Sequence, residues 1–326
     1  MCIRDSNITH KEMELDVFDT PEWINKVDGS LKFSIEFANF NRIGETWIHP
    51  FLVSGSNDNI MSAETCSSHI PLNIYQSQPD YVNDNYILPN IRSQTFVEPE
   101  GQNEDGRLGM VGYHIDAGKY AQLLKDESLK RSNLSLIDAH VTGISVKDEN
   151  ITNLILSNGD IIDADLFIDC TGFRALLANA VGSKWDTSYS ERLYVDSALA
   201  VQLPYIDRST QMRNTTYCHA LQNGWVWNVP LQTRIGTGYV YSSRHTSEDD
   251  ARMEFKKHLN EMYGYNKEEL SFRKLDFGVG IRRESWKNNV IAIGLSSFFL
   301  EPIESTAIST MHHQISTVYN LSLIHI

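Results

Sequence analysis

The most informative stretch of the sequence is IAIGLSSFFLEPIESTAI, residues 291–308. It continues the apolar run 290–294, which predicts a buried strand, and it leads into apolar residues at helical spacing. These helical positions are Ala307, Ile308, Met311, Ile315 and Tyr319. A strand, a turn with glycine and a helix, in this order, are typical of α/β proteins that bind nucleotides.

The turn inside this stretch carries the polar groups. Glu301 and Glu304 precede Ser305 and Thr306, either of which would cap the helix. The backbone N–H groups of Thr306 and Ala307 would then face outward, which is a favourable place for an anion. Taken alone, two carboxylates before a helix are more often a solvated loop, with the amides capped by side chains.

A second segment repeats this order of elements. Residues 165–170, DLFIDC, form a nearly continuous apolar run, Thr171-Gly172 follows as a turn, and residues 173–180 suit a helix. Taken alone, this segment also fits a plain core strand and helix. Just before it, Asn158-Gly159 predicts a hairpin with a two-residue turn, because both turn positions favour a positive φ.

Between the two segments the pattern becomes antiparallel. Residues 193–241 read as strands, with WVWNVP (225–230) and TGYVY (237–241) as neighbours. Trp225 and Trp227 share one face of their strand, because side chains alternate with a period of two. The later return to an α/β pattern predicts one sheet interrupted by another domain.

Two helices are predicted from their ends. One begins at Asp116, whose carboxylate can accept from the first-turn amides, and runs towards Asn133. The other begins at Thr246 or Ser247, both with capping-box spacing, and ends near Gly264.

The N-terminal part predicts one strand and a long polar segment. Residues 31–40 alternate apolar and polar side chains, which indicates a half-buried strand, and Lys32 faces away from its apolar side. A lysine in such a place is usually solvated. Residues 56–112 show no sustained period and are predicted to be loops with short elements.

Composition excludes several classes of protein. The chain has 326 residues and a net charge of −14. Without a cluster of Lys and Arg, this acidity argues against nucleic acid or an anionic membrane as partner. The longest apolar stretch, 290–300, is too short and too polar to span a bilayer. Four scattered cysteines predict neither a disulfide framework nor a metal site, and they favour the cytoplasm.

Together these segments resemble the flavin-dependent halogenases of the tryptophan halogenase type. The resemblance rests on GWVWNVP (224–230), similar to the family's WxWxIP signature with Val229 in the Ile position, and on IGLSSFFLEPIEST (293–306), similar to its active-site segment. Four more segments are similar to family segments: SLKFSIEF (30–37), WIHPF (47–51), YHIDAGKY (113–120) and DLFIDCTGFRALL (165–177).

The resemblance implies a fold and an activity. The fold is α/β (α+β), a flavin monooxygenase-like FAD-binding fold interrupted by an antiparallel sheet on the substrate side. The activity is that of an oxidoreductase, which uses reduced FAD, O2 and chloride or bromide to make hypohalous acid. By motif position, Lys32 delivers this halogen to an electron-rich, indole-like or phenolic small molecule. A separate flavin reductase is the expected partner, because no NAD(P)H domain is visible.

Roles for other residues follow only from their positions in the family's motifs. Glu304 and Ser305 would act beside Lys32 as catalytic residues, and the backbone of Thr306 and Ala307 would hold the halide. His49 and Phe51 would stack on the substrate. The cofactor-binding residues would be Thr171, Gly172, Gly294, Leu295, Trp225 and Trp227, the two tryptophans shielding the flavin side of the tunnel.

Departures from the family bear on the domain organisation. The GxGxxG turn expected upstream of the catalytic lysine is missing, since Gly236-Thr237-Gly238 and Gly278-Val279-Gly280 read as strand glycines. The chain is therefore expected to be truncated at both ends. We expect non-native residues at 1–6 and 321–326, and an FAD-binding core at 7–190 and 276–320 interrupted by the antiparallel region 191–275. Phe298 stands where many family members have Gly, and Ala307 stands where Gly or Ser is usual.

Two other functions stay open. A flavin-dependent aromatic hydroxylase would share the fold, but hydroxylation has no need of a halogen-carrying amine such as that of Lys32. A non-catalytic remnant that binds flavin or an aromatic ligand would explain the missing phosphate loop, and an incomplete chain need not be active.

Overall fold

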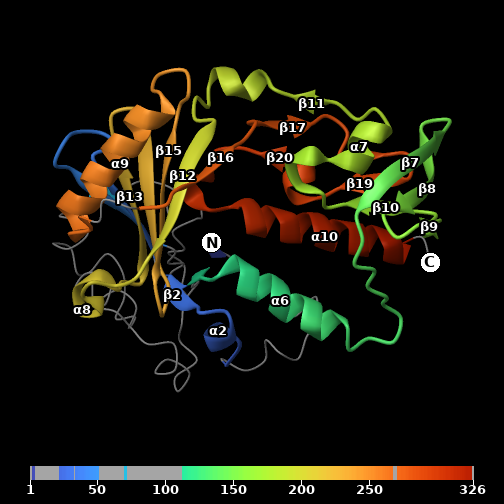
Figure 1. Ribbon diagram of the computed structural model, residues 1–326, viewed down its shortest axis with the longest axis horizontal. Helices are drawn as coiled ribbons and strands as arrows, with labels where there is room; N and C mark the ends of the chain where they lie inside the picture. Colours follow the sequence, from blue (N-terminus) through green and yellow to red (C-terminus); the bar gives the residue numbers. More distant parts are fainter. Residues whose placement is uncertain are drawn as a thin grey trace, which may run out of the picture. The chain divides into compact units, whose positions relative to one another are not determined.

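The computed structural model describes residues 2–3, 22–32, 34–50, 70–71, 112–266 and 270–324. These residues belong to two compact units (Figure 1). The first unit comprises residues 1–127, 195–276 and 303–306, and the second comprises 128–194, 277–302 and 307–326. Segments distant in the sequence are thus combined in each unit.

The first unit contains an eight-stranded sheet with the order β16-β12-β15-β14-β13-β3-β4-β5. All neighbours are antiparallel except β13 and β3, which are parallel. The predicted antiparallel block is confirmed, with Trp227 opposite Gly238. The strands are β3 (Ser34–Ala38), β4 (Thr46–Pro50), β5 (Ile70–Pro71), β12 (Ser197–Leu203), β13 (Thr215–Ala220), β14 (Gly224–Pro230), β15 (Ile235–Tyr241) and β16 (Arg273–Asp276).

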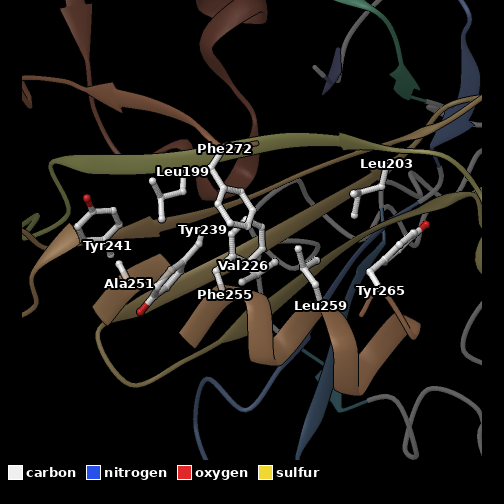
Figure 2. Packing of buried hydrophobic residues seen from close by; sticks show 10 residues of the cluster. All are labelled: Leu199, Leu203, Val226, Tyr239, Tyr241, Ala251, Phe255, Leu259, Tyr265 and Phe272. Carbon is white, nitrogen blue, oxygen red and sulfur yellow. The ribbon is translucent and has the colours of Figure 1, made fainter. Parts of the chain in front are cut away.

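Helix α9 (Glu248–Tyr263) packs on one face of this sheet (Figures 1 and 2). Its predicted ends are confirmed. Ser247 Oγ accepts from the Asp250 N–H at 3.1 Å, and Gly264 ends the helix with a φ of +76°. Figure 2 shows the side chains that fill the interface: Leu199, Leu203, Val226, Tyr239, Tyr241, Ala251, Phe255, Leu259, Tyr265 and Phe272.

The predicted half-buried strand 31–40 is wrong in two respects. The described residues form two strands, β2 (Ser30–Lys32) and β3, which belong to different sheets. Both strands are buried on both faces, so that Lys32 is only 1% exposed. Polar residues at alternate positions here mark a polar interior and not a solvated face. A lysine in such a place is usually solvated, but Lys32 is not.

Strand β2 lies in a small sheet with the order β1-β6-β2, where β1 is Cys2–Ile3 and β6 is Gly112–His114. Two helices belong to the same unit, α2 (Glu22–Lys26) and α6 (Ala117–Ser128), together with the short α8 (Arg208–Gln211). Asp116 Oδ1 accepts from the Gly118 and Lys119 N–H groups at 2.9 and 3.1 Å, which confirms the predicted cap. The helix ends at Ser128 and not near Asn133.

The second unit is built from three small sheets, with the orders β7-β8-β9, β10-β19-β18 and β11-β17-β20. Strand β10 pairs in parallel with β19, so that one sheet continues across the antiparallel block, as predicted. The strands are β7 (Val141–Lys147), β8 (Asn150–Leu156), β9 (Ile161–Ile162), β10 (Phe167–Asp169), β11 (Trp185–Asp186), β17 (Gly280–Arg282), β18 (Trp286–Lys287), β19 (Val290–Ala292) and β20 (Phe298–Phe299).

Two local predictions in this unit are corrected. The β8–β9 hairpin exists, but the Leu156 N–H donates to Asp160 O at 2.9 Å, which leaves a three-residue turn. Within this fully described turn only Gly159 has a positive φ, +89°. The predicted helix 173–180 is interrupted: a 3₁₀ turn η4 (Gly172–Arg174) precedes α7 (Leu176–Ala180), with Ala175 at a φ of +41° between them.

The predicted last helix is α10 (Ala307–Ile324). Within the described ranges, no helix is both long enough and apolar enough to cross a membrane.

A buried histidine on α9 predicts acid sensitivity. His258 is 5% exposed, and its ring lies 4.7 Å from that of His219 and 6.3 Å from that of Tyr263. Burial, and then the neighbouring His219, lower the pKa of His258 to about 4 from its ordinary value of 6.5. Between these values the unfolded chain binds a proton that the folded chain does not, so stability falls as the pH drops from 6.5 to 4.

We expect the free energy of unfolding to fall by about 2 kcal/mol between about pH 7.5 and pH 5 because of this group. His258→Phe should remove that part of the pH dependence, as measured by urea unfolding at both pH values. His245→Gln, at an exposed position, is the control. An unchanged pH dependence in His258→Phe would contradict the assignment.

Candidate functional site

Lys32 ends strand β2, where its register partner on β6 is Gly112. The residue is 1% exposed, which is rare for lysine because a buried ammonium group loses its hydration. Ser34 and Glu36 on β3 are buried as well, and Glu36 has a pKa above its ordinary value because of its burial. Lys32, Ser34 and Glu36 are therefore three polar side chains buried in the first unit.

The structure describes one of the two residues predicted to contact the substrate. His49 lies on β4 opposite Ile35 and is 2% exposed. Phe51 lies outside the described residues. Strands β14, β13, β3 and β4 are consecutive in the large sheet, so His49 and the two tryptophans of β14 belong to the same sheet.

Trp225 and Trp227 share one face of β14, as predicted. Their ring centroids are 6.4 Å apart and the rings are inclined by 64°. Val226 between them points to α9 on the opposite face. The tryptophans therefore lie on the face of the sheet that α9 does not cover.

Trp227 is positioned by the absence of a side chain at Gly238. A Cβ added at Gly238 would lie 2.1 Å from Trp227 Cη2 and 2.6 Å from Leu199 O. Gly238→Ala should therefore displace the indole ring at a cost of about 1–3 kcal/mol. We expect a lower melting temperature and a changed tryptophan fluorescence spectrum.

Gly236 on the same strand supplies a matched control, because a Cβ there would meet Arg234 Nη1 only at 3.4 Å. Gly236→Ala should leave the fluorescence spectrum unchanged. Equal spectral changes in both variants would refute the close packing of Trp227 on Gly238.

The segment around the predicted catalytic carboxylate is tightly turned. Residues Pro302–Glu304 form a 3₁₀ turn, and Ser305 follows with a φ of +58°, which is unfavourable for a residue other than glycine. Such conformations concentrate at functional sites. Thr306 then leads into α10, whose first residue is Ala307. Only the backbone of Glu304 is described.

Four of the six predicted cofactor-binding residues lie in two turns of the second unit. Thr171 and Gly172 follow β10, and Gly294 and Leu295 follow β19 in the 3₁₀ turn η6 (Gly294–Ser296). Gly172 and Gly294 have φ values of +69° and +63°. Ser296 Oγ donates to Gly172 O at 3.1 Å and lies 3.2 Å from Asp169 Oδ1, so the structure brings the two turns together.

Asp169, which no motif had singled out, organises these turns. Its Oδ1 accepts from the N–H and the hydroxyl of Thr171 at 2.9 and 2.7 Å, and its Oδ2 accepts from the N–H groups of Leu177 and Ala178, both at 2.9 Å. Burial raises the pKa of Asp169, but these hydrogen bonds outweigh it and hold the pKa below its ordinary value. The feature of the sequence that could have identified Asp169 is an acidic residue at the end of a buried strand.

Arg282 supports the same turns. It is 5% exposed and donates to Ser296 O from Nε at 2.6 Å, to Ser183 O from Nη1 at 2.6 Å and to Asn179 Oδ1 from Nη2 at 2.8 Å. Burial lowers the pKa of Arg282, while the charge of Asp169 opposes this shift. The buried guanidinium therefore depends on a nearby carboxylate for its charge balance.

The site residues fall into two sets. Lys32, His49, Trp225, Trp227 and residues 304–306 belong to the first unit, whereas Thr171, Gly172, Gly294, Leu295 and Ala307 belong to the second. The second set consists of the two glycine turns and the first residue of α10.

Known proteins are similar to this chain over most of its length. The tryptophan halogenase family model matches residues 6–322. The tryptophan 6-halogenase of Streptomyces toxytricini is 30% identical over 95% of this chain and 61% of its own length. The tryptophan 7-halogenase of Lentzea aerocolonigenes is 31% identical over 88% of this chain and 55% of its own length.

A solved flavin-dependent halogenase from Xanthomonas campestris superimposes with a TM-score of 0.77 at 28% identity, covering 98% of this chain and 62% of that one. The chain thus spans between 55% and 62% of the length of these three proteins. The similarity confirms the predicted α/β fold class. This chain belongs to the tryptophan halogenase family.

Proposed function

We propose that this protein is an FAD-dependent halogenase that places chlorine or bromine on an electron-rich, indole-like or phenolic small molecule. The observation that carries the proposal is the burial of Lys32, 1% exposed, in the unit that also holds Trp225, Trp227 and the Glu304 turn. Two of the relatives named above are tryptophan halogenases, which supports an aromatic substrate.

The second unit supports a flavin. Its two turns place Gly172 and Gly294 at positive φ, and a Cβ at Gly172 would meet no atom within 4 Å. Open backbone of this kind allows a cofactor to approach closely. Phe173 and Leu295, 45% and 39% exposed, offer apolar surface in the same turns. Thr171, Gly172, Gly294 and Leu295 would hold FAD, and Trp225 and Trp227 would shield its reactive side.

Reduced FAD, when bound, supplies hypohalous acid from O2 and a halide ion. The Lys32 amine would hold that hypohalous acid by a hydrogen bond or as a haloamine, and would present the halogen to a ring carbon. The halogen would replace a ring hydrogen, whose proton would pass to the Glu304 carboxylate and from there to the hypohalous oxygen, which leaves as water.

Other residues would bind the reactants. His49 and Phe51 would stack on the aromatic ring, Ser305 would act beside Glu304, and the N–H groups of Thr306 and Ala307 at the start of α10 would bind the halide. A separate flavin reductase and a cytoplasmic location remain predictions.

The experiment supplies the protein with FAD, a flavin reductase, NADH and bromide or chloride. Indoles and phenols are offered, and products are scored by their halogen isotope pattern in mass spectrometry. Halogenated product is expected. Hydroxylated product without halogen, or flavin oxidation that yields only peroxide across the whole panel, would overturn the proposal.

A further inference from the structure

His114 on β6 is fully buried and joins three strands by side-chain hydrogen bonds. Its Nδ1 lies 3.1 Å from Ser30 Oγ on β2, and its Nε2 lies 2.9 Å from Thr216 Oγ1 on β13. Ser30 Oγ in turn donates to Pro230 O, at the end of the β14 strand, at 2.8 Å. Ser30 and Thr216 are 0% and 2% exposed, so water does not compete for these bonds.

The available protons decide which group donates in each hydrogen bond that links Pro230, Ser30, His114 and Thr216. Pro230 O can only accept, so it takes the single hydroxyl proton of Ser30. Ser30 Oγ then accepts from His114 Nδ1–H, and in the neutral imidazole Nε2 accepts from the Thr216 hydroxyl. Ser30 and Thr216 together therefore select the Nδ1–H form of His114.

This chain of hydrogen bonds holds the strand that carries Lys32. Strand β2 has only three residues, and Ser30 is the register partner of His114 while Lys32 is that of Gly112. The middle residue is also held, since Asn214 Nδ2 donates to Leu31 O at 2.9 Å. So short a strand has few backbone hydrogen bonds of its own, and the side chains of His114 and Asn214 add two more.

We infer that His114 is a positioning residue for Lys32, acting with Ser30 and Thr216 to fix strand β2 against β13 and β14. The inference rests on the proposed function of Lys32. When a hydrogen bond of His114 to Ser30 or Thr216 is removed, the Lys32 amine loses its fixed place. The amine then reacts more readily with reagents in solution. It also captures less of the hypohalous acid that the flavin side produces.

The test compares three threonine variants of the full chain. Thr216→Val keeps the side-chain shape but removes the hydroxyl that donates to His114 Nε2, and Thr216→Ser keeps that hydroxyl. Thr237→Val is the matched control: Thr237 is 1% exposed and its Oγ1 donates to Trp227 O at 2.6 Å, in the same sheet but away from β2. Ser30→Ala removes the other side-chain hydrogen bond of His114, and it is the second test variant in case Thr216→Val does not fold.

The first measurement does not depend on activity. Amine-labelling rates of Lys32 are determined by peptide mass spectrometry relative to Lys257, whose side chain is 74% exposed. We expect Thr216→Val to raise the labelling rate of Lys32, relative to that of Lys257, about tenfold. The loss of one buried hydrogen bond shifts the equilibrium of local opening by about this factor. Thr216→Ser and Thr237→Val should keep the wild-type rate.

The second measurement is the ratio of halogenated product to hypohalous acid trapped by a scavenger. It should fall in Thr216→Val and recover in Thr216→Ser, with flavin oxidation unchanged. Wild-type labelling and product ratio in both Thr216→Val and Ser30→Ala would overturn the inference, as would equal effects in Thr237→Val. A wild-type protein that makes no halogenated product would instead refute the proposed function, and the labelling rates would still test the place of His114.

Discussion

Lys32→Ala is expected to lower the rate of halogenated product by roughly a thousandfold or more, because a reagent held beside its target has an effective concentration of about 10⁵ M or higher. Flavin oxidation should continue at the wild-type rate, since that step needs no amine. Hypohalous acid made without the lysine should escape, so the scavenger signal should rise as product falls. Product is measured by mass spectrometry and flavin oxidation by absorbance in the same reaction.

Lys257→Ala is the control for loss of a lysine. The Lys257 side chain is 74% exposed and makes a 3.9 Å ion pair with Glu261 on α9, which contributes little to stability. This variant should retain wild-type product formation. If Lys32→Ala halogenates within about tenfold of the wild type, the role of Lys32 in halogen delivery is wrong.

Much of the local structure was predictable because it depends on neighbouring residues. Ser247, Gly264 and Asp116 satisfy backbone groups within one helical turn, so their residue types alone predicted the helix ends. The shared face of Trp225 and Trp227 follows from the geometry of any strand. The resemblance to the family added only the role expected of these tryptophans beside the flavin.

The burial of Lys32 was not predictable from alternation. A period of two shows that two faces differ, but it does not show whether the second face meets water or a polar interior. The contacts that bury Ser30 and His114 join residues 84, 102 and 200 positions apart, and no local pattern contains them. Ala175, at a φ of +41°, likewise interrupts a segment whose composition suits a helix.

Asp169→Asn is expected to lower the free energy of unfolding by about 4 kcal/mol and to abolish FAD binding. If the amide oxygen takes the place of Oδ1, the N–H groups of Leu177 and Ala178 lose their acceptor, at about 1–3 kcal/mol for each buried donor. In the other orientation both bonds from Thr171 are lost. Either way Arg282 stays buried without its nearby carboxylate, which adds to the cost.

Asp207→Asn is the matched control, because it makes the same Asp-to-Asn change at an exposed helix cap. Asp207 caps the exposed α8 by accepting from the Ser209 N–H at 2.9 Å, and asparagine caps helices about as well as aspartate. Its free energy of unfolding should therefore match the wild type. Urea unfolding gives the energies, and flavin fluorescence titration gives FAD affinity. Because the second unit holds both glycine turns through Asp169, normal FAD binding by Asp169→Asn would show that those turns do not hold the cofactor.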